Sequence, residues 1–238
     1  MHPYYEKKQS KLKKEMDQYL SLISAELEAE TKQPYAALLE EIWQYYRDEI
    51  LEKLPYVGGD ASSGTKNLTG TYCFVAMGVV VRQYGVTLER WGYLSTLAYQ
   101  RYFAKIPAFV KKLARKLFAK PRLVTAALKK KDAKNAANAA RNPGSFETKT
   151  QPGTAEFPVI YHTVVCPLAD FAAQYGYQEY MPYLCNLDYV MFASFGVPFY
   201  RTKTCAAGDG YCNFSMRAGG EIVPAWPCHS LDENDPLK

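Results

Sequence analysis

The chain has 238 residues, of which 48% are apolar, and this is enough for one large globular domain. Its net charge of +5 is concentrated between Lys105 and Lys134, where eleven Lys or Arg residues stand with one acid, Asp132. Because the rest of the chain is acidic, this balance argues against a globally basic protein that binds nucleic acid. Twenty tyrosines are available for pocket walls, where a ring packs while its hydroxyl bonds.

The sequence contains no candidate for a membrane span and no cleavable signal. The N-terminus is rich in Lys and Glu, and the longest apolar run, around residues 73–81, is too short and too interrupted to cross a bilayer. We therefore expect a cytoplasmic protein without an integral membrane segment. In that reducing compartment its six cysteines are expected to be thiols rather than disulfides.

Helical periodicity dominates residues 1–128. Apolar residues recur at three- and four-residue steps between residues 4 and 54, and Pro34 predicts a break between two helices there. A third helix is expected over residues 68–84, and Thr87 is a good N-cap for a fourth.

Pro107 opens a basic amphipathic helix. Its apolar residues are expected on one side and its basic residues on the other, where they form a solvated face. An anionic membrane or an acidic polymer is the alternative partner for this helix. The apolar set is Phe109, Val110, Leu113, Leu117 and Phe118, and the basic set is Lys111, Lys112, Arg115, Lys116 and Lys120.

In the second half of the chain the spacing of apolar residues changes from a helical to a strand-like pattern. Residues 129–154 are poor in apolar side chains and predict a basic, polar surface linker. Residues 157–165 then alternate as a strand, and residues 197–205 and 211–217 predict a hairpin around a glycine turn. Helices are expected between these strands.

The order of the elements predicts an α+β fold, in which N-terminal helices pack on a C-terminal unit with a mostly antiparallel sheet. We divide the chain into a helical region (1–128), the linker (129–154) and an α+β region (155–238). The three parts are expected to form one compact domain.

The segment from Cys166 to Phe214 concentrates four of the six cysteines, a carboxylate, an isolated arginine and a glycine turn. Five of its elements resemble, in order, the C-terminal signature of the L-2-amino-thiazoline-4-carboxylate hydrolase family. Two positions depart from that pattern, because Asn213 stands where the family commonly carries Asp and Cys205 where an apolar residue is commoner. The five elements are Cys166-Pro167, Cys185-x-x-Asp188-Tyr189, Arg201-Thr202-x-Thr204, Gly208 and Cys212-x-Phe214.

Cys185 and Asp188 are three residues apart, so a helix places the thiol and the carboxylate on one face. The resemblance implies a catalytic role for both. Without it, Cys185 is equally well explained as a small buried hydrophobe and Asp188 as a local cap.

Cys166 is the second candidate nucleophile, because it stands where a strand leads into a helix. Free N–H groups at such a junction favour a thiolate, and Pro167 fits the first helical position. His162 shares the face of Cys166 in a regular strand and would form a thiol–imidazole pair with it. The alternatives are a packed cysteine and a satisfied polar histidine.

Arg201 offers a planar fork for a substrate carboxylate, or else forms a structural salt bridge, for which Asp188 is one partner. The signature makes Thr204 and Tyr189 further substrate-binding candidates. Thr204, however, is expected on the strand face opposite to Arg201.

The resemblance implies a hydrolase for a small-molecule substrate, a cyclic amidine such as 2-aminothiazoline-4-carboxylate, which opens to a carbamoyl-cysteine. A thiolate (Cys185 or Cys166) or an activated water attacks the ring carbon, and Asp188 or His162 handles the proton. No cofactor is needed for this chemistry, while a divalent metal and a homo-oligomer both stay open.

A second hypothesis comes from a different class, a non-catalytic ligand-binding or sensor module with a zinc–thiolate site. Its ligands would come from Cys166, Cys185, Cys205 and Cys212. The cysteines on either side of a glycine turn are similar to those of vinyl-reductase-like sensor domains. An enzyme requires Cys185, Asp188 and Arg201 to converge, whereas a sensor requires thiolates around a metal.

Overall fold

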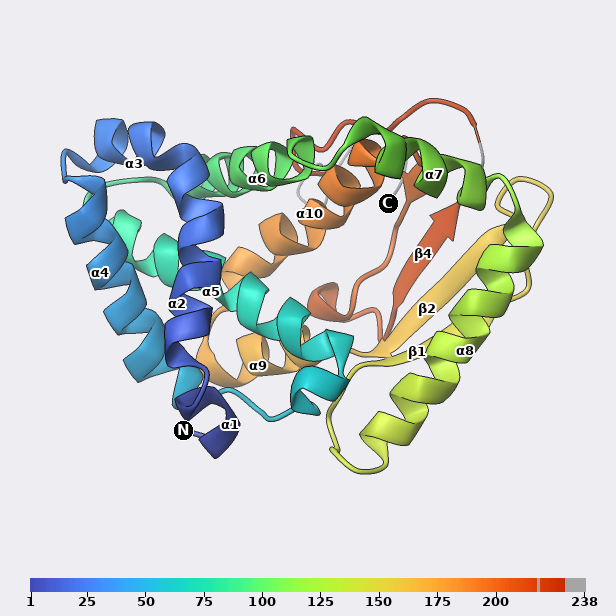
Figure 1. Ribbon diagram of the computed structural model, residues 1–238, viewed down its shortest axis with the longest axis horizontal. Helices are drawn as coiled ribbons and strands as arrows, with labels where there is room; N and C mark the ends of the chain where they lie inside the picture. Colours follow the sequence, from blue (N-terminus) through green and yellow to red (C-terminus); the bar gives the residue numbers. More distant parts are fainter. Residues whose placement is uncertain (218, 230–238) are drawn as a thin grey trace.

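The computed structural model describes residues 1–217 and 219–229 (Figure 1). Helices build the N-terminal part and a four-stranded antiparallel sheet the C-terminal part, which confirms the predicted α+β fold. The α-helices are α1 (Pro3–Glu6), α2 (Gln9–Leu20), α3 (Ser24–Thr31), α4 (Tyr35–Tyr45), α5 (Ser63–Gln83), α6 (Leu88–Ala104), α7 (Ala108–Phe118), α8 (Pro121–Ala139), α9 (Pro167–Tyr175) and α10 (Met181–Ser194). Shorter turns are η1 (Ser21–Ile23), η2 (Tyr46–Leu51), η3 (Gly59–Ala61), η4 (Gln178–Tyr180) and η5 (Cys205–Ala207).

The helix boundaries follow signals that the sequence carries. Pro34 is the N-cap of α4, which confirms the predicted break. The Thr87 side chain accepts a hydrogen bond from the Arg90 N–H and so caps α6, as expected. Pro167 occupies the first turn of α9, directly after Cys166 at its N-cap. Among the described residues, no helix has both the length and the apolar character that a bilayer crossing requires.

The apolar stripes of the N-terminal helices form one core with α5 and α6. The α5 helix is buried on all sides over most of its length, because α4, α6 and α9 pack around it. Helices α6 and α10 approach each other closely at Gly92, where a Cβ would overlap the ring of Tyr183. This close contact carries α10 towards the sheet (Figure 1).

The sheet has the order β1-β2-β4-β3, formed by β1 (Glu147–Gln151), β2 (Val159–Val165), β3 (Phe199–Tyr200) and β4 (Cys212–Met216). All neighbours are antiparallel, and Tyr161 pairs with Phe214 and Thr163 with Cys212. Because side chains alternate along a strand, Tyr161, Thr163, Cys212 and Phe214 share one face. We call this face, which includes buried Phe199, the inner face of the sheet.

Residues 129–154 do not form the predicted linker. They form the second half of α8 and the edge strand β1. The reason is a set of polar contacts: Thr148 and Thr150 both donate hydroxyl hydrogen bonds to Asp132 of α8, at 2.7 and 2.5 Å. Polar pairs therefore stabilise this edge of the sheet, where a surface linker without regular structure was expected. The predicted hairpin is present, although its first strand covers only Phe199–Tyr200.

Candidate active site

Arg201 and Asp188 form a buried ion pair between the loop after β3 and helix α10. Arg201 Nη1 donates to Asp188 Oδ2 at 2.6 Å, and Nη2 donates to the backbone carbonyl of Cys185 at 2.6 Å. The Arg201 side chain is only 2% exposed. Both terminal nitrogens are thus engaged with the protein, as in the structural salt bridge considered as the alternative for this residue. The pair joins strand and helix and fixes the Asp188 carboxylate.

Aromatic rings enclose the Arg201 guanidinium. Its central carbon lies 5.6–5.7 Å from the ring centroids of Tyr189, Phe199 and Phe214. The Tyr189 hydroxyl donates to the Arg201 carbonyl at 3.1 Å and accepts from the Arg201 N–H at 3.2 Å. Tyr189 is itself buried. These contacts give Tyr189 a positioning role and leave Arg201 little surface for a substrate carboxylate.

Asp188 differs from its partner because 34% of its side chain is exposed. Burial nevertheless raises the pKa of its carboxyl group above the usual range, and the positive charge of Arg201 only partly opposes this effect. Asp188 therefore combines access to water with a carboxyl pKa that is raised above its usual range.

Cys185 lies one helical turn before Asp188 on α10 and is half-buried. Burial raises the pKa of its thiol to about 12, although Arg201 acts in the opposite direction. A thiol with this pKa is neutral at physiological pH and is a weak nucleophile. Cys185 contacts the ion pair through its backbone carbonyl, which accepts the hydrogen bond from Arg201 Nη2.

Three other thiols form a cluster at the end of the inner face, namely Cys166, Cys205 and Cys212. Hydrogen bonds from the Cys166 and Cys205 thiols lower the pKa of Cys212 far below that of an ordinary cysteine. The backbone N–H of Cys205 also donates to Cys212 Sγ at 3.2 Å, and the charge of Arg201 acts in the same direction. The same cluster raises the pKa of Cys166, contrary to the expectation from its place at a helix N-terminus. Of the three thiols, Cys212 is the one whose pKa this cluster lowers.

The cluster contains three of the four cysteines that were considered as zinc ligands. Cys185 interacts with it through charge, because the Cys212 thiolate raises the Cys185 pKa. Within residues 1–217 and 219–229, no group of three or more His, Cys, Asp or Glu side chains is arranged to hold a metal ion. Cys73, Cys166, Cys185, Cys205 and Cys212 are free thiols.

His162 and Thr204 lie apart from this constellation. His162 pairs with Asn213 on the outer face of the sheet, and its ring stacks on Tyr211 at 4.4 Å. The partners of Cys166 are therefore two thiols rather than this imidazole. Thr204 caps the short turn η5, where its hydroxyl accepts from the Ala207 N–H at 3.1 Å. Its side chain organises the loop between Arg201 and Cys212.

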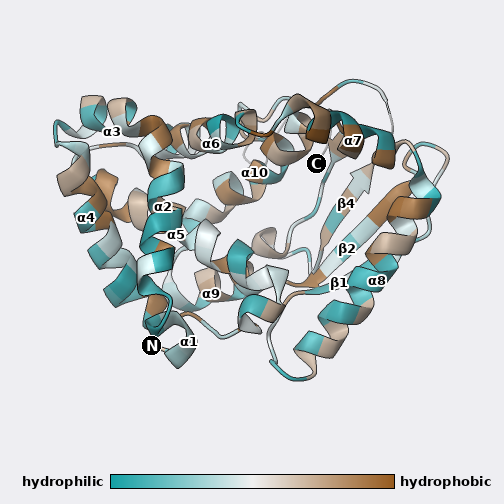
Figure 2. Cartoon of the chain, in the orientation of Figure 1, coloured by the Kyte–Doolittle hydropathy of each residue, from teal (hydrophilic) through white to brown (hydrophobic). Residues whose placement is uncertain are grey.

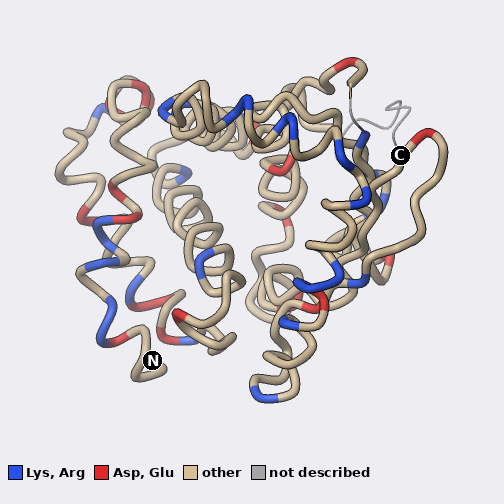
Figure 3. Tube along the Cα trace, turned by 45° about the vertical axis from the view of Figure 1, so that its right-hand side comes forward, with Lys and Arg blue, Asp and Glu red and all other residues tan. Residues whose placement is uncertain are grey.

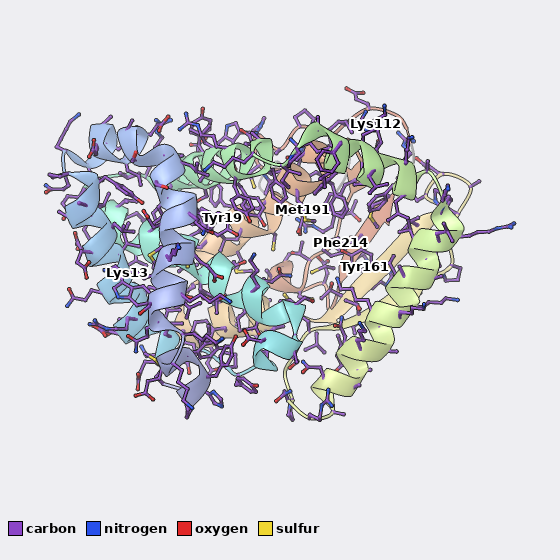
Figure 4. All side chains as sticks on the ribbon, in the orientation of Figure 1. Lys13, Tyr19, Lys112, Tyr161, Met191 and Phe214 are labelled. Carbon is purple, nitrogen blue, oxygen red and sulfur yellow. The ribbon has the colours of Figure 1, made fainter. Side chains whose placement is uncertain are left out.

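Lys131 is a residue of the site that the sequence interpretation missed. It projects from α8, and its ammonium group lies 5.7 Å from the centroid of the Tyr161 ring, which stacks on Phe214. Burial lowers the pKa of Lys131, while the negative charges of Asp132 and Asp188 oppose this change. Figure 4 shows Tyr161, Phe214 and Met191 of α10 around the same central space. Val124, Leu128 and Lys131 recur at helical spacing, and this was the signal available in the sequence.

A separate pocket of about 360 Å³ lies between α2 and the start of α5. It is lined mainly by polar residues, and four of its charged groups form ion pairs, since Lys8 Nζ lies 2.8 Å from Asp60 Oδ2 and Lys11 Nζ lies 3.8 Å from Glu15 Oε1. It contains none of the thiols described above. We therefore place the chemistry at Asp188 and the thiol cluster instead.

A comparison with known protein families found one match. The model of the L-2-amino-thiazoline-4-carboxylic acid hydrolase family matches residues 96–216, which is half of the chain. The chain belongs to this family. The matched region of this hydrolase family includes Lys131, Asp188, Arg201 and the thiol cluster, and it ends with β4. Neither the curated proteins nor the solved structures contain a match to the chain.

Proposed function

We propose that this protein hydrolyses a small cyclic amidine that carries a carboxylate, with 2-aminothiazoline-4-carboxylate as the substrate and a carbamoyl-cysteine as the product. The observation that carries this proposal is the electrostatic coupling of a thiolate to a carboxyl group. The charge of Cys212 raises the pKa of Asp188, and Asp188, Arg201 and Cys212 all act on the pKa of Tyr161. These groups therefore lie close enough to act on one small molecule.

We infer that the reaction takes place in a recess between α8, α10 and the inner face of the sheet. Asp188 and Lys131 both have exposed surface, yet burial is the main cause of the pKa shift of each. Partial exposure together with a pKa shift caused by burial is typical of side chains that line a small space open to water. Such spaces are the usual place for small-molecule sites.

The opposite pKa shifts of Cys212 and Asp188 suit this chemistry. An ordinary cysteine and aspartate at neutral pH are a thiol and a carboxylate. Here the Cys212 pKa is lowered, which favours the thiolate, and the Asp188 pKa is raised, which makes this carboxyl group easier to protonate than an ordinary aspartate. Environments that shift two pKa values in this manner define a nucleophile and a proton donor.

In the proposed reaction Cys212 Sγ forms a bond with the ring carbon that lies between sulfur and two nitrogens. The C=N electron pair moves to the ring nitrogen, which takes the proton of Asp188. The ring C–S bond then breaks, its electron pair leaves with the substrate sulfur as a thiolate, and the carbon with its two nitrogens stays bound to the sulfur of Cys212 as an isothiourea. Water adds to that carbon while the Asp188 carboxylate accepts its proton, and Cys212 leaves as the thiolate.

Lys131 is the group that binds the substrate carboxylate, the role first considered for Arg201. Its ammonium group lies over the Tyr161 ring and forms no ion pair with another described residue, whereas the Arg201 guanidinium is bound to Asp188 and the Cys185 carbonyl. A partly desolvated ammonium group attracts a carboxylate strongly. Arg201 holds Asp188 in position.

The proposal is tested by incubating the purified protein with 2-aminothiazoline-4-carboxylate and following carbamoyl-cysteine by mass spectrometry, with and without an added divalent metal. We expect turnover by the wild type and a covalent adduct on the Cys212 peptide during it. Absence of hydrolysis of this compound and of related cyclic amidines would overturn the proposal.

A further inference from the structure

The exposed face of α7 and the start of α8 has a composition that differs from the rest of the surface. Within the described residues, the large apolar side chains that are exposed all lie here: Phe109 (72%), Leu113 (67%), Leu117 (47%) and Leu123 (55%). Phe109, Leu113 and Leu117 are four residues apart, so they form one row along α7. We call these four residues the apolar row.

The structure divides the apolar residues of α7 in a way that the sequence did not predict. Phe118 points inward, and its ring lies 6.2 Å from that of Phe192 on α10. Val110 and Phe118 are half-buried, whereas Phe109 and Leu113 point away from the protein. The helix is therefore packed on one side and still presents a second apolar surface (Figure 2).

Basic residues flank the apolar row. Lys112 and Lys116 are exposed and stand on the turns beside Leu113, and Lys120 follows at the junction with α8. The sequence contains no Asp or Glu between Glu89 and Asp132 to neutralise them. Figure 3 shows basic residues along this edge of the molecule. The exposed face of α7 and the start of α8 thus consists of the apolar row with lysines beside it.

We propose that this face docks the protein on an anionic lipid surface. Leu and Phe side chains enter the boundary between headgroups and acyl chains, while lysines at the same level attract anionic headgroups. A second copy of this chain is a poorer occupant, because a symmetric contact would bring the lysines of two copies together. A polyanion such as RNA would match the lysines but would leave the apolar row exposed to water.

The docked helix lies next to the recess. Phe118 contacts Phe192 of α10, the helix that carries Asp188, and α7 leads directly into α8, the helix that carries Lys131. Docking through α7 would therefore hold the protein with its site close to the lipid surface. The lipid proposal itself rests on the surface alone and does not depend on the proposed reaction.

The test is sedimentation of the full chain with vesicles made of equal parts of phosphatidylcholine and phosphatidylglycerol, compared with phosphatidylcholine alone. We expect binding to the anionic vesicles that weakens as salt is raised. Two variants change the face without changing the core: Phe109→Gln with Leu113→Gln, and Lys112→Gln with Lys116→Gln and Lys120→Gln. Loss of the three lysines should weaken binding on the order of a hundredfold.

The matched control for the lysine variant is Lys7→Gln with Lys14→Gln and Lys149→Gln, which makes the same change in net charge at exposed positions elsewhere. We expect it to bind like the wild type. Equal loss in the control, equal binding to neutral vesicles, or no binding by the wild type would each overturn the proposal. Undiminished binding of the Phe109→Gln/Leu113→Gln variant to the anionic vesicles would also overturn it. That result would mean that the lysines alone bind negative charge, as expected for a polyanion partner. A dimer in light scattering that this variant dissociates, without vesicle binding, would replace it with self-association.

Discussion

The Arg201 guanidinium binds the Asp188 carboxylate at 2.6 Å and the Cys185 carbonyl at the same distance, so that one side chain joins the loop after β3 to a full turn of α10. The arginine is buried, while its carboxylate partner keeps a third of its side-chain surface open. This difference in exposure suits two different roles. The buried Arg201 holds its partner in position, whereas the partly exposed Asp188 is accessible to a substrate and to water.

Replacement of Arg201 by Met is expected to lower the free energy of unfolding by about 3 kcal/mol, because it leaves the Asp188 charge without its partner. The remaining Asp188 pKa should rise further, since Arg201 lowers it. Urea denaturation measures the first effect and the pH profile of activity the second. In the double variant Arg201→Met/Asp188→Asn the loss of stability should be smaller than the sum of the single losses. Additive losses would contradict the ion pair.

Asp188→Asn keeps a side chain of the same size but removes the proton donor. We expect kcat to fall by about 10²- to 10⁴-fold while the protein stays folded. The wild-type activity should decline as pH rises through the raised pKa of Asp188, because the carboxyl group then loses its proton. Asp188→Glu, which retains the titrating group, serves as the control and should keep a similar pH dependence. Near-normal turnover by Asp188→Asn would exclude its role as the acid.

Alanine variants of Cys212, Cys185 and Cys166 distinguish between the possible nucleophiles. Cys212→Ala is expected to reduce turnover on the order of 10³-fold or more, because a covalent nucleophile is lost. Cys185→Ala should retain most activity, since the raised pKa keeps that thiol neutral. Cys166→Ala should weaken activity through the loss of a hydrogen bond to Cys212. If all three variants remain active, water attacks the substrate directly.

Lys131→Gln is expected to raise KM by roughly 10- to 100-fold with a smaller change in kcat, because a charge-assisted bond to the substrate carboxylate is lost. Lys131→Arg should recover part of the affinity. Lys130→Gln is a matched control, since this neighbouring residue is exposed on the same helix. Steady-state kinetics on a carboxylate-bearing and a carboxylate-free cyclic amidine decide the role. An equal effect on both substrates would argue against it.

His162→Gln should leave activity unchanged within about a factor of three, because the residue stacks on Tyr211 at the outer face of the sheet. Burial and the charge of Lys203 lower the pKa of His162. The neutral ring therefore contributes stability above the unfolded pKa of about 6.5, and this contribution is lost as pH falls through the folded pKa. The variant should lose less stability on acidification. A large loss of activity instead would restore His162 to the site.

The residues that follow local rules were predictable from the sequence. Pro34, Thr87 and Pro167 mark helix starts because a cap or a proline acts within one turn of the chain. The clustering of reactive residues between Cys166 and Cys212 also carried the family assignment. The segment around Asp132 was misread, because its partners Thr148 and Thr150 are polar and leave no apolar period in the sequence.

What only the tertiary structure decided is which of these residues face one another. Sequence spacing placed Cys185 beside Asp188 on one helix, but the thiol whose pKa is lowered is that of Cys212, because the fold brings Cys166, Cys205 and a backbone N–H to its sulfur. The sequence interpretation placed Lys131 in a surface linker, but the fold places it on α8 with its ammonium group over the Tyr161 ring. The pKa of a side chain and its exposure to solvent both depend on neighbours that are distant in the chain. Neither can therefore be predicted from local sequence patterns.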